Sequence, residues 1–234
     1  MENMKYHVKN KKVLIVAAHP DDEILGCGGT IARLVKEGNK AITLILGEGK
    51  TARDVLRDKN KRETEISKLK KEALEANKII GVSEVILFDF PDNRFDEVAL
   101  LDIVKTIEKI KQKVKPDIIF THYQRDLNID HQIVNKAVLT ATRPTDTETV
   151  KEIYSFEVLS STEWNYPNKF IPDTYFDITE TIDKKLKAMS FYKSELKMFP
   201  HPRSLEGIKL NASYWGMKVG LKYAEVFKCV RSIK

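Results

Sequence analysis

Four short apolar runs lack the alternating polar face of a half-exposed strand, and this feature most constrains the fold. Residues 13–18 read Val-Leu-Ile-Val-Ala-Ala, and residues 41–46, 85–90 and 117–121 are runs of the same kind. Such runs are typical of strands that are buried on both sides, because helices cover both faces of a parallel sheet. They therefore predict a buried parallel sheet.

The segments between these runs have the apolar spacing of amphipathic helices. Strands that alternate with helices form the βαβ rhythm of a doubly wound sheet. The predicted fold class is therefore α/β: a Rossmann-like doubly wound, mostly parallel sheet with helices on both faces and a C-terminal α+β elaboration. The predicted helices are residues 24–36, 52–80, 97–114, 129–140, 182–196 and 204–219, and the further predicted strands are residues 150–159, 171–178 and 224–230.

The composition is that of a globular protein. The chain has 234 residues, 42% hydrophobic and 32% charged, which excludes disorder and fibrous repeats. No linker or internal repeat divides it, so we expect a single domain over residues 1–234. The net charge of +6 is a mild bias towards anionic ligands. Basic residues within 57–71 alternate with Glu63 and Glu65, which indicates a solvated helix face and no nucleic-acid partner.

Two further features indicate a cytoplasmic location. Cys27 and Cys229 are the only cysteines and lie more than 200 positions apart, which is no disulfide framework and favours a reducing compartment. The N-terminal segment is polar and lacks the apolar core of a secretory signal. No apolar run approaches the ~20 residues of a membrane span.

The order of the predicted strands indicates where a ligand binds. In a doubly wound sheet the ligand site lies outside the carboxyl ends of the strands, at the point where the strand order reverses. With right-handed crossovers and the order 3-2-1-4-5, the first and fourth strands are neighbours at this point. The loops after Ala18 and after Thr121 are therefore expected to face each other. Three of the five histidines lie in these two loops.

Both loops carry side chains that bind metal ions. The first reads Ala-His-Pro-Asp-Asp-Glu over residues 18–23, and the second ends with Asn-Ile-Asp-His over residues 128–131. Two imidazoles and one carboxylate are the ligand set of a catalytic zinc site, which keeps a fourth position for water. Because adjacent side chains leave the backbone in different directions, we expect Asp21 to contact the bound water while Asp22 binds the metal. The predicted metal ligands are His19, Asp22 and His131.

The same residues also have a simpler interpretation. Acidic side chains after a proline at a helix start complement the positive end of the helix dipole, which accounts for Pro20, Asp21 and Asp22 without any metal. On that alternative the chain is a non-catalytic, Rossmann-like binding module. What favours a metal site is that His19 and His131 follow the two strands that flank the reversal of strand order.

The two motifs resemble those of a known family, the PIG-L or LmbE-like zinc-dependent N-deacetylases. The segment His-Pro-Asp-Asp-Glu over residues 19–23 is similar to the first motif of the family, and Asp-His over residues 130–131 is similar to the second. Residues 199–204, Phe-Pro-His-Pro-Arg-Ser, are similar to a segment of some bacterial members. The resemblance implies the zinc ligands His19, Asp22 and His131 and the general base Asp21.

The activity that this resemblance implies is hydrolysis of the N-acetyl group of an amino sugar, in a glycan precursor, a sugar nucleotide or a glycoconjugate. The implied cofactor is one Zn²⁺ per chain, which lowers the pKa of bound water from ~15.7 to ~7 and polarises the acetyl oxygen. The family also makes self-association into trimers or hexamers an expectation. An amidase that acts on a thiol conjugate or another N-acyl compound is the alternative within the same chemistry.

One position departs from the family pattern. Many members have a histidine three residues before the metal-binding histidine, where it helps to stabilise the oxyanion, but this chain has Asn128. An asparagine amide donates a hydrogen bond and cannot deliver a proton, so we expect another acid. His201, in a rigid and cationic His-Pro-Arg turn, is the preferred candidate, and His122 is the second. We expect Asp130 to orient a group beside the metal.

Substrate contacts are expected from loops at the same edge of the sheet. Residues 47–53 follow the second predicted strand, and residues 91–94 follow the third. Their side chains suit hydrogen bonds to sugar hydroxyls or ion pairs with a phosphate or uronate. The candidate substrate-binding residues are Arg53, Asp92, Asn93, His122 and Arg203.

Overall fold

The structure, a computed structural model, describes residues 9–53, 58 and 60–234. Among the helices in this part of the chain, none combines the length and the apolar character that a membrane crossing requires. The strands are β1 (Lys12–Ala17), β2 (Lys40–Gly47), β3 (Glu84–Phe90), β4 (Ile118–His122), β5 (Glu152–Phe156), β6 (Thr174–Asp177) and β7 (Ala224–Ser232). The helices are α1 (Asp22–Lys36), α2 (Glu63–Ile80), α3 (Leu100–Val114), α4 (Ile129–Ala141), α5 (Ile182–Met189) and α6 (Leu205–Met217).

The strands form a single sheet that is mostly parallel. They follow the order β3-β2-β1-β4-β5-β7-β6, so the predicted order 3-2-1-4-5 is confirmed and β1 and β4 are neighbours. The pairs β1–β2, β2–β3, β1–β4 and β4–β5 are parallel, and β7 is antiparallel to both β5 and β6. The C-terminal elaboration therefore extends the same sheet.

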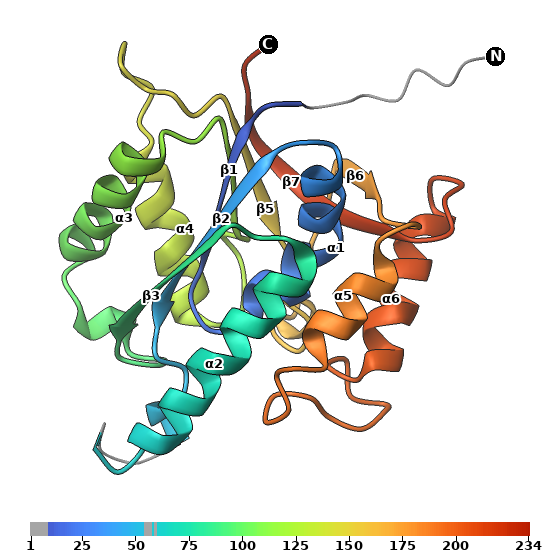
Figure 1. Ribbon diagram of the computed structural model, residues 1–234, viewed down its shortest axis with the longest axis horizontal. Coiled ribbons are helices and arrows are strands. Elements are labelled where there is room, and N and C mark those ends of the chain that lie inside the picture. The colour runs from blue at the N-terminus through green and yellow to red at the C-terminus, as the bar shows by residue number, and fades with distance from the viewer. Residues whose placement is uncertain (1–8, 54–57, 59) are drawn as a thin grey trace.

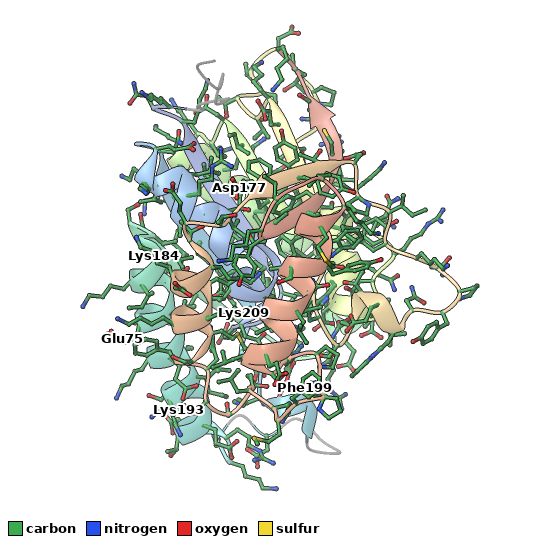
Figure 2. The ribbon with its side chains drawn as sticks, turned by 90° about the vertical axis from the view of Figure 1, so that its right-hand side faces the viewer. Glu75, Asp177, Lys184, Lys193, Phe199 and Lys209 are labelled. Atoms are coloured by element: carbon green, nitrogen blue, oxygen red, sulfur yellow. The ribbon has the colours of Figure 1, made fainter. Side chains whose placement is uncertain are left out.

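Helices cover both faces of this sheet, as predicted. Figure 1 shows α3 and α4 on one side and α1, α2, α5 and α6 on the other. Figure 2 shows α5 and α6 side by side, with Lys193 and Phe199 of the segment that connects them at the lower end of the molecule. These layers make the two largest hydrophobic clusters, one on each face of the sheet.

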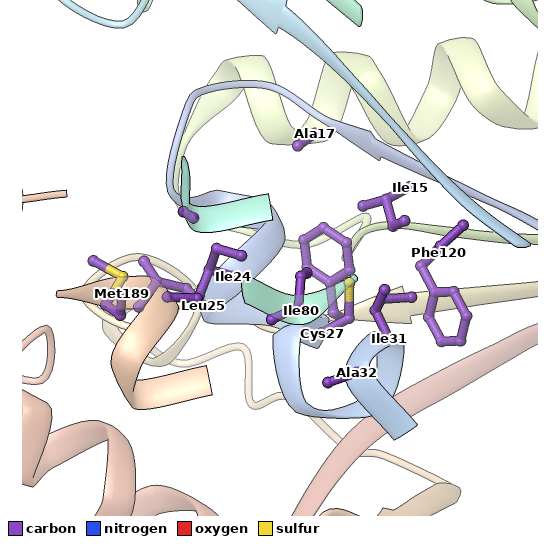
Figure 3. Packing of buried hydrophobic residues seen from close by; sticks show 14 of the residues in the cluster. Ile15, Ala17, Ile24, Leu25, Cys27, Ile31, Ala32, Ile80, Phe120 and Met189 are labelled. Carbon is purple, nitrogen blue, oxygen red and sulfur yellow. The ribbon is translucent and has the colours of Figure 1, made fainter. Parts of the chain in front are cut away.

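β1 lacks a polar face because both of its faces are buried. Its alternate side chains Ile15 and Ala17 pack in the cluster that also contains Ile24, Cys27 and Ile31 of α1 (Figure 3). The side chains between them belong to the cluster beneath α3 and α4. At about 25 cal/mol per Å² of buried apolar surface, these two clusters supply most of the driving force for folding. They also hold the carboxyl end of β1 rigidly in place.

The predicted helix over residues 52–80 is wrong at its N-terminal end. Residues Thr51–Arg53 form a separate 3-10 turn, and α2 begins only at Glu63. Asp58 accepts a hydrogen bond from the backbone N–H of Lys61, and this turn precedes the helix. Local hydrogen bonds from an aspartate side chain compete with the helical ladder, which explains the later start.

The predicted helix over residues 182–196 ends early, because α5 stops at Met189. Tyr192 and Leu196 continue the apolar spacing of a helix, but they lie in turns that pack on the hydrophobic cluster of α1 and α2. The strand predicted over residues 171–178 is also shorter, since β6 spans four residues. The other predicted elements differ from the observed bounds by a few residues at their ends.

Candidate metal centre and active site

The loop after β1 turns sharply into α1. Ala18 is held at the end of the strand, because its backbone N–H donates to His122 Nε2 at 2.8 Å. The next backbone N–H, that of His19, donates to Asp22 Oδ2 at 2.8 Å. Asp21, which lies between His19 and Asp22 in the chain, has a φ of 108°. This is a left-handed conformation that residues other than glycine rarely adopt. This turn gives Asp21 and Asp22 different directions.

The structure brings His19, Asp22 and His131 together. Asp22 Oδ2 lies 3.4 Å from His19 Nδ1 and 3.3 Å from His131 Nε2. One donor atom from each residue lies within 4.8 Å of the other two, and all three side chains are buried. The first turn of α4 supplies His131, and the β1–α1 junction supplies the other two. The result is a compact set of two nitrogens and one oxygen.

A carboxylate holds the far side of each imidazole. Asp130 Oδ2 lies 2.8 Å from His19 Nε2, and Asp130 Oδ1 accepts a hydrogen bond from the backbone N–H of Phe95. Asp126 Oδ1 lies 3.1 Å from His131 Nδ1. A carboxylate at one ring nitrogen favours the proton there and leaves the other nitrogen as an electron-pair donor. The donors directed at the centre are therefore His19 Nδ1 and His131 Nε2.

Asp126 is a residue that the sequence analysis missed. It is fully buried, and it accepts hydrogen bonds from the hydroxyl groups of Ser161 and Thr162 in the loop after β5. The pattern Asp-x-Asn-x-Asp-His over residues 126–131 carried a signal, because it puts a second carboxylate at short spacing from Asp130. Which histidine each carboxylate holds depends on the fold around α4.

The charges at this centre favour a cation. Burial lowers the pKa of His131, but Asp22 and Asp126 outweigh this effect and raise that pKa to about 9. Burial also lowers the pKa of His19, and hydrogen bonds to Asp130 and Asp22 raise it well above the usual value. Burial raises the pKa of Asp22, yet the neighbouring imidazoles hold it well below its usual range.

One buried atom tests whether a metal ion fits. Asp22 Oδ1 has no hydrogen-bond partner among the residues that the structure describes. A buried carboxylate oxygen without a partner costs free energy unless a cation or a donor occupies the space beside it. Two imidazole nitrogens and a carboxylate oxygen form the donor set of catalytic zinc sites, which leave one position open. The residues present therefore fit a divalent metal ion.

His122 lies inside the protein, behind the candidate centre. Its ring is fully buried and stacks on the ring of His131, with centroids 3.9 Å apart. Burial and the charge of His131 hold its pKa well below the usual value. Because it accepts the Ala18 N–H and has no exposed surface, this residue is not placed to contact a substrate or to protonate a leaving group.

Asp21 pairs with the predicted substrate residue Arg203. The guanidinium Nη1 donates to Asp21 Oδ2 at 2.9 Å, and Arg203 Nε donates to the carbonyl of Leu159 at 3.3 Å. Burial raises the pKa of Asp21 well above its usual value, and Arg203 opposes this effect. Glu195 lies 4.0 Å from the same guanidinium and pairs with the buried Lys50 at 2.5 Å. Arg203 is therefore neutralised within the protein.

Asn128 joins two loops beside the candidate centre. Its Oδ1 caps α4 by accepting from Asp130 N–H at 2.8 Å, and its Nδ2 donates to Asn93 Oδ1 at 2.7 Å. Asn93 Nδ2 donates in turn to Asp92 Oδ1. Asp92 Oδ1 lies 3.4 Å from His19 Nε2, and Asp92, His19 and Asp130 form a second group of possible metal ligands. One N–H of Asn128 has no part in these bonds and can serve a ligand.

His201 lies at the rim, away from the three clustered ligands. Its Nδ1 accepts the backbone N–H of Arg203 at 3.1 Å, and its ring meets Trp164 edge to face, with centroids 5.7 Å apart. Burial and nearby positive charges lower its pKa. Because Nδ1 accepts a hydrogen bond, the neutral ring carries its proton on Nε2. The side chain of Arg53 lies outside the described residues.

A family model and two curated relatives that match this chain are all named as deacetylases. The model of the PIG-L family, described as GlcNAc-PI de-N-acetylase, matches residues 14–142, just over half of the chain. The uncharacterized deacetylase YaiS of Escherichia coli is 28% identical over 80% of this chain and 92% of its own length. The probable N-acetyl-alpha-D-glucosaminyl L-malate deacetylase 2 of Bacillus cereus is 30% identical over 79% of this chain and 84% of its own length.

Two further matches bear on fold and on activity. The structure of N,N'-diacetylchitobiose deacetylase from Pyrococcus horikoshii superposes with a TM-score of 0.74 at 22% identity, over 94% of this chain and 84% of that one. At that identity the match shows the fold alone. The 4-oxalmesaconate hydratase of Pseudomonas putida is 27% identical over 76% of this chain and 72% of its own length.

Proposed function

The chain belongs to the PIG-L family, and on this premise we propose that it is a zinc-dependent hydrolase that removes the N-acetyl group from an N-acetylated amino sugar. The observation that carries the proposal is the buried group of His19, Asp22 and His131, each imidazole held by its own carboxylate. The curated deacetylase relatives support an amide-cleaving enzyme that acts on sugars of the N-acetylglucosamine type.

His19 Nδ1, an Asp22 oxygen and His131 Nε2 would hold one Zn²⁺ per chain. When bound, this ion supplies Lewis-acid chemistry, since it lowers the pKa of water and polarises the acetyl oxygen. Asp130 and Asp126 keep the two imidazoles in the tautomers that leave these nitrogens unprotonated. In this proposal His122 positions His131 by stacking on its ring.

Asp21 is the proposed general base. It takes a proton from the attacking water and afterwards provides it to the departing amine. Arg203 orients the carboxylate by donating to Asp21 Oδ2, which leaves Oδ1 free to accept the proton. The remaining N–H of Asn128 is the proposed donor to the oxyanion, and such a donor typically contributes about 10²–10³ in rate. His201, at the rim, is the proposed alternative source of the amine proton, which it would supply from its imidazolium form.

The substrate contacts proposed for a sugar ring lie on two loops. Asp92 and Asn93 follow β3 at the edge of the metal centre, and Arg53 follows β2. Because Arg203 already pairs with Asp21, we propose that it orients the base rather than binds a phosphate or uronate. An amidase that acts on a thiol conjugate shares the same centre, and only the rim distinguishes the two.

Acetate release tests this proposal. The purified protein is assayed with N-acetylglucosamine, its nucleotide-linked form and an N-acylated thiol conjugate. We expect release from an amino sugar, and a loss of at least about 10²-fold in kcat for Asp21→Asn with the zinc content unchanged. His19→Ala and His131→Ala are expected to lose the zinc itself. Near-normal turnover in Asp21→Asn would remove Asp21 from the role of base.

Hydration is a second candidate activity, because one relative is a hydratase. Addition of water to a double bond also needs an activated water and a positioned base, so the same residues suit it. The two activities are separated by offering 4-oxalmesaconate in a parallel assay. Loss of substrate absorbance without acetate release from any N-acetyl compound would favour the hydratase.

Three expectations from the sequence stay proposals. We propose a single domain over residues 1–234, because the strands of the described residues join one sheet. We propose a cytoplasmic location, because Cys27 and Cys229 are both free thiols. Trimers or hexamers, which the family resemblance implies, are a matter for light scattering on the purified protein.

A further inference from the structure

The backbone of the proposed base is strained. Asp21 has φ 108° and ψ −28°, and a residue with a Cβ pays for such a conformation unless the surroundings impose it. Its carbonyl accepts the N–H groups of Ile24 and Leu25 in the first turn of α1. Its own N–H donates to Glu23 Oε2 at 3.0 Å. The side chain of Glu23 thus bonds to the very residue whose conformation is strained.

Two separate elements hold Glu23, and a third supports one of them. Its Oε1 accepts the Tyr192 hydroxyl at 2.5 Å and Asn77 Nδ2 at 2.9 Å. Asn77 lies on α2, and its Oδ1 accepts the hydroxyl of Thr43 on β2 at 2.7 Å. Tyr192 lies in the turn after α5. All four side chains are at most 1% exposed, so the position of Glu23 depends on the packed interior.

An ordinary helix cap does not explain this arrangement. A glutamate in the first turn of a helix often bonds to the backbone N–H at the helix start, and that one bond is all that the cap requires. Glu23 has the same reach but is buried and accepts three hydrogen bonds. A buried carboxylate is costly, so a cap alone would be better served by an exposed residue.

We propose that Glu23 is a positioning residue that imposes the left-handed conformation of Asp21 and so directs the Asp21 carboxylate to Arg203 and to the metal centre. If Asp21 relaxed to an ordinary helical φ, its Cβ would swing to another side of the backbone and the 2.9 Å contact with Arg203 would be lost. The catalytic part of this inference rests on the proposed function, in which Asp21 is the base.

The first experiment measures catalysis. We expect Glu23→Ala to lower kcat at least about tenfold with zinc content and KM within twofold, because a misplaced base costs rate and leaves ground-state binding unchanged. Glu23→Gln keeps one acceptor and should recover part of the loss. Glu63→Gln, at an exposed first-turn glutamate of α2, is the matched control and should retain full activity.

The same experiment includes a background without the base. If Glu23 acts through Asp21, adding Glu23→Ala to Asp21→Asn should cause no further loss of kcat, since residues that act as a unit are not additive. An equal loss in both backgrounds would overturn the proposal, because Glu23 would then act on the site by another route.

The second experiment needs no activity. The stabilities of Asp21→Gly and Asp21→Ala are compared by equilibrium unfolding. The unfolding equilibrium constant of the glycine variant should be about fivefold smaller, because glycine adopts a positive φ without steric cost. With Glu23→Ala also present, residue 21 relaxes and this preference should fall below about twofold. An unchanged preference would overturn the proposal.

The two experiments test the proposed function and the role of Glu23 separately. If no substrate is hydrolysed but the glycine preference depends on Glu23, then the proposed function is wrong and the control of the backbone by Glu23 stands. If Glu23→Ala does not fold, Tyr192→Phe takes its place in both experiments, because it removes one donor from the same carboxylate. The fall in kcat and the fall in the glycine preference are both expected again, but smaller. If neither measurement changes, the proposal is overturned.

Discussion

At the scale of single residues, the candidate centre consists of side chains that each have two tasks. Asp130 holds His19 with one oxygen and the backbone of Phe95 with the other. Asp126 holds His131 while it ties the loop after β5 to α4. The positions of the donor atoms therefore depend on residues that touch no metal.

Asp126→Asn is expected to weaken zinc binding about 10–100-fold, the usual cost of removing a carboxylate behind a ligating histidine. The amide no longer favours the proton on His131 Nδ1, so Nε2 is less often the free donor. Competition with a chromogenic chelator measures the change. Asp117→Asn is the control, because that carboxylate bonds to the backbone of Lys12 far from the centre. Equal zinc affinity in the two variants would contradict the prediction.

The cluster of proposed ligands was predictable from the sequence, whereas its supporting residues were not. His19, Asp22 and His131 follow from two short motifs and the order of the strands. Asp126 and Glu23 are ordinary acidic residues in a chain with 34 of them. Their roles depend on contacts with Ser161 and Tyr192, which lie far along the chain. Such contacts are set by packing, and no local pattern encodes them.

At the scale of elements, α1 packs tightly on the sheet beneath the site. A Cβ at Gly26 would overlap the ring of Phe156 on β5. That ring packs edge to face on His122, with centroids 4.9 Å apart, and His122 stacks on His131. The close approach of α1 thus supports the metal centre from below.

We expect Gly26→Ala to lower the free energy of unfolding by about 1–3 kcal/mol, the usual cost of overpacking a core. Because the displaced Phe156 ring presses on His122, zinc affinity should fall as well. Urea unfolding and chelator competition measure the two effects. Gly28→Ala is the matched control, since a Cβ there would come no closer than 3.2 Å to a neighbouring atom, Cγ2 of Ile24. Equal stability of the two variants would show that the contact is not limiting.

The boundaries of the elements were harder to predict from the sequence than the elements themselves, because long-range contacts set them. Tyr192 and Leu196 extend the helical period of α5, but the helix stops at Met189. Tyr192 is fully buried with its hydroxyl on Glu23, and this long-range contact outweighs a modest helical propensity. The strands, in contrast, were readable because both of their faces are apolar.

A half-buried carboxylate directly after β5, Glu157, makes stability depend on pH. Glu157 accepts hydrogen bonds from Asn211 and Trp215, yet burial raises its pKa above the usual 4.5. The folded protein therefore binds this proton more tightly than the unfolded chain. From about pH 4.5 up to the raised pKa, the contribution of Glu157 to the free energy of unfolding falls as pH rises.

Glu157→Gln removes this dependence, because the amide keeps an acceptor for Asn211 and Trp215 and carries no charge. The variant should gain stability relative to the unmodified protein at about pH 8, and the gain should shrink at about pH 5. Urea unfolding at the two pH values measures it, with Glu84→Gln at an exposed position as the control. A gain of the same size at both pH values would place the effect outside the ionisation of Glu157.

At the scale of the whole molecule, the candidate centre joins two halves of the sheet. The β1–α1 junction supplies two donors and α4 supplies the third, and the two helices lie on opposite faces of the sheet. The loops that surround this point come from β2, β3 and β5 and from the segment before α6. The three donors therefore meet only where the folded sheet brings these two segments of the chain together.

Because these donors assemble only in the folded chain, zinc should stabilise the whole molecule. A ligand that binds only the folded state adds RT ln(1 + [L]/Kd), about 2.7 kcal/mol at a free concentration of 100 Kd. Removing zinc with a chelator should lower the urea midpoint without changing the slope of the transition. His131→Ala should be insensitive to zinc, because one of the three donors is gone. An equal zinc-induced shift in this variant would mean that the ion binds elsewhere.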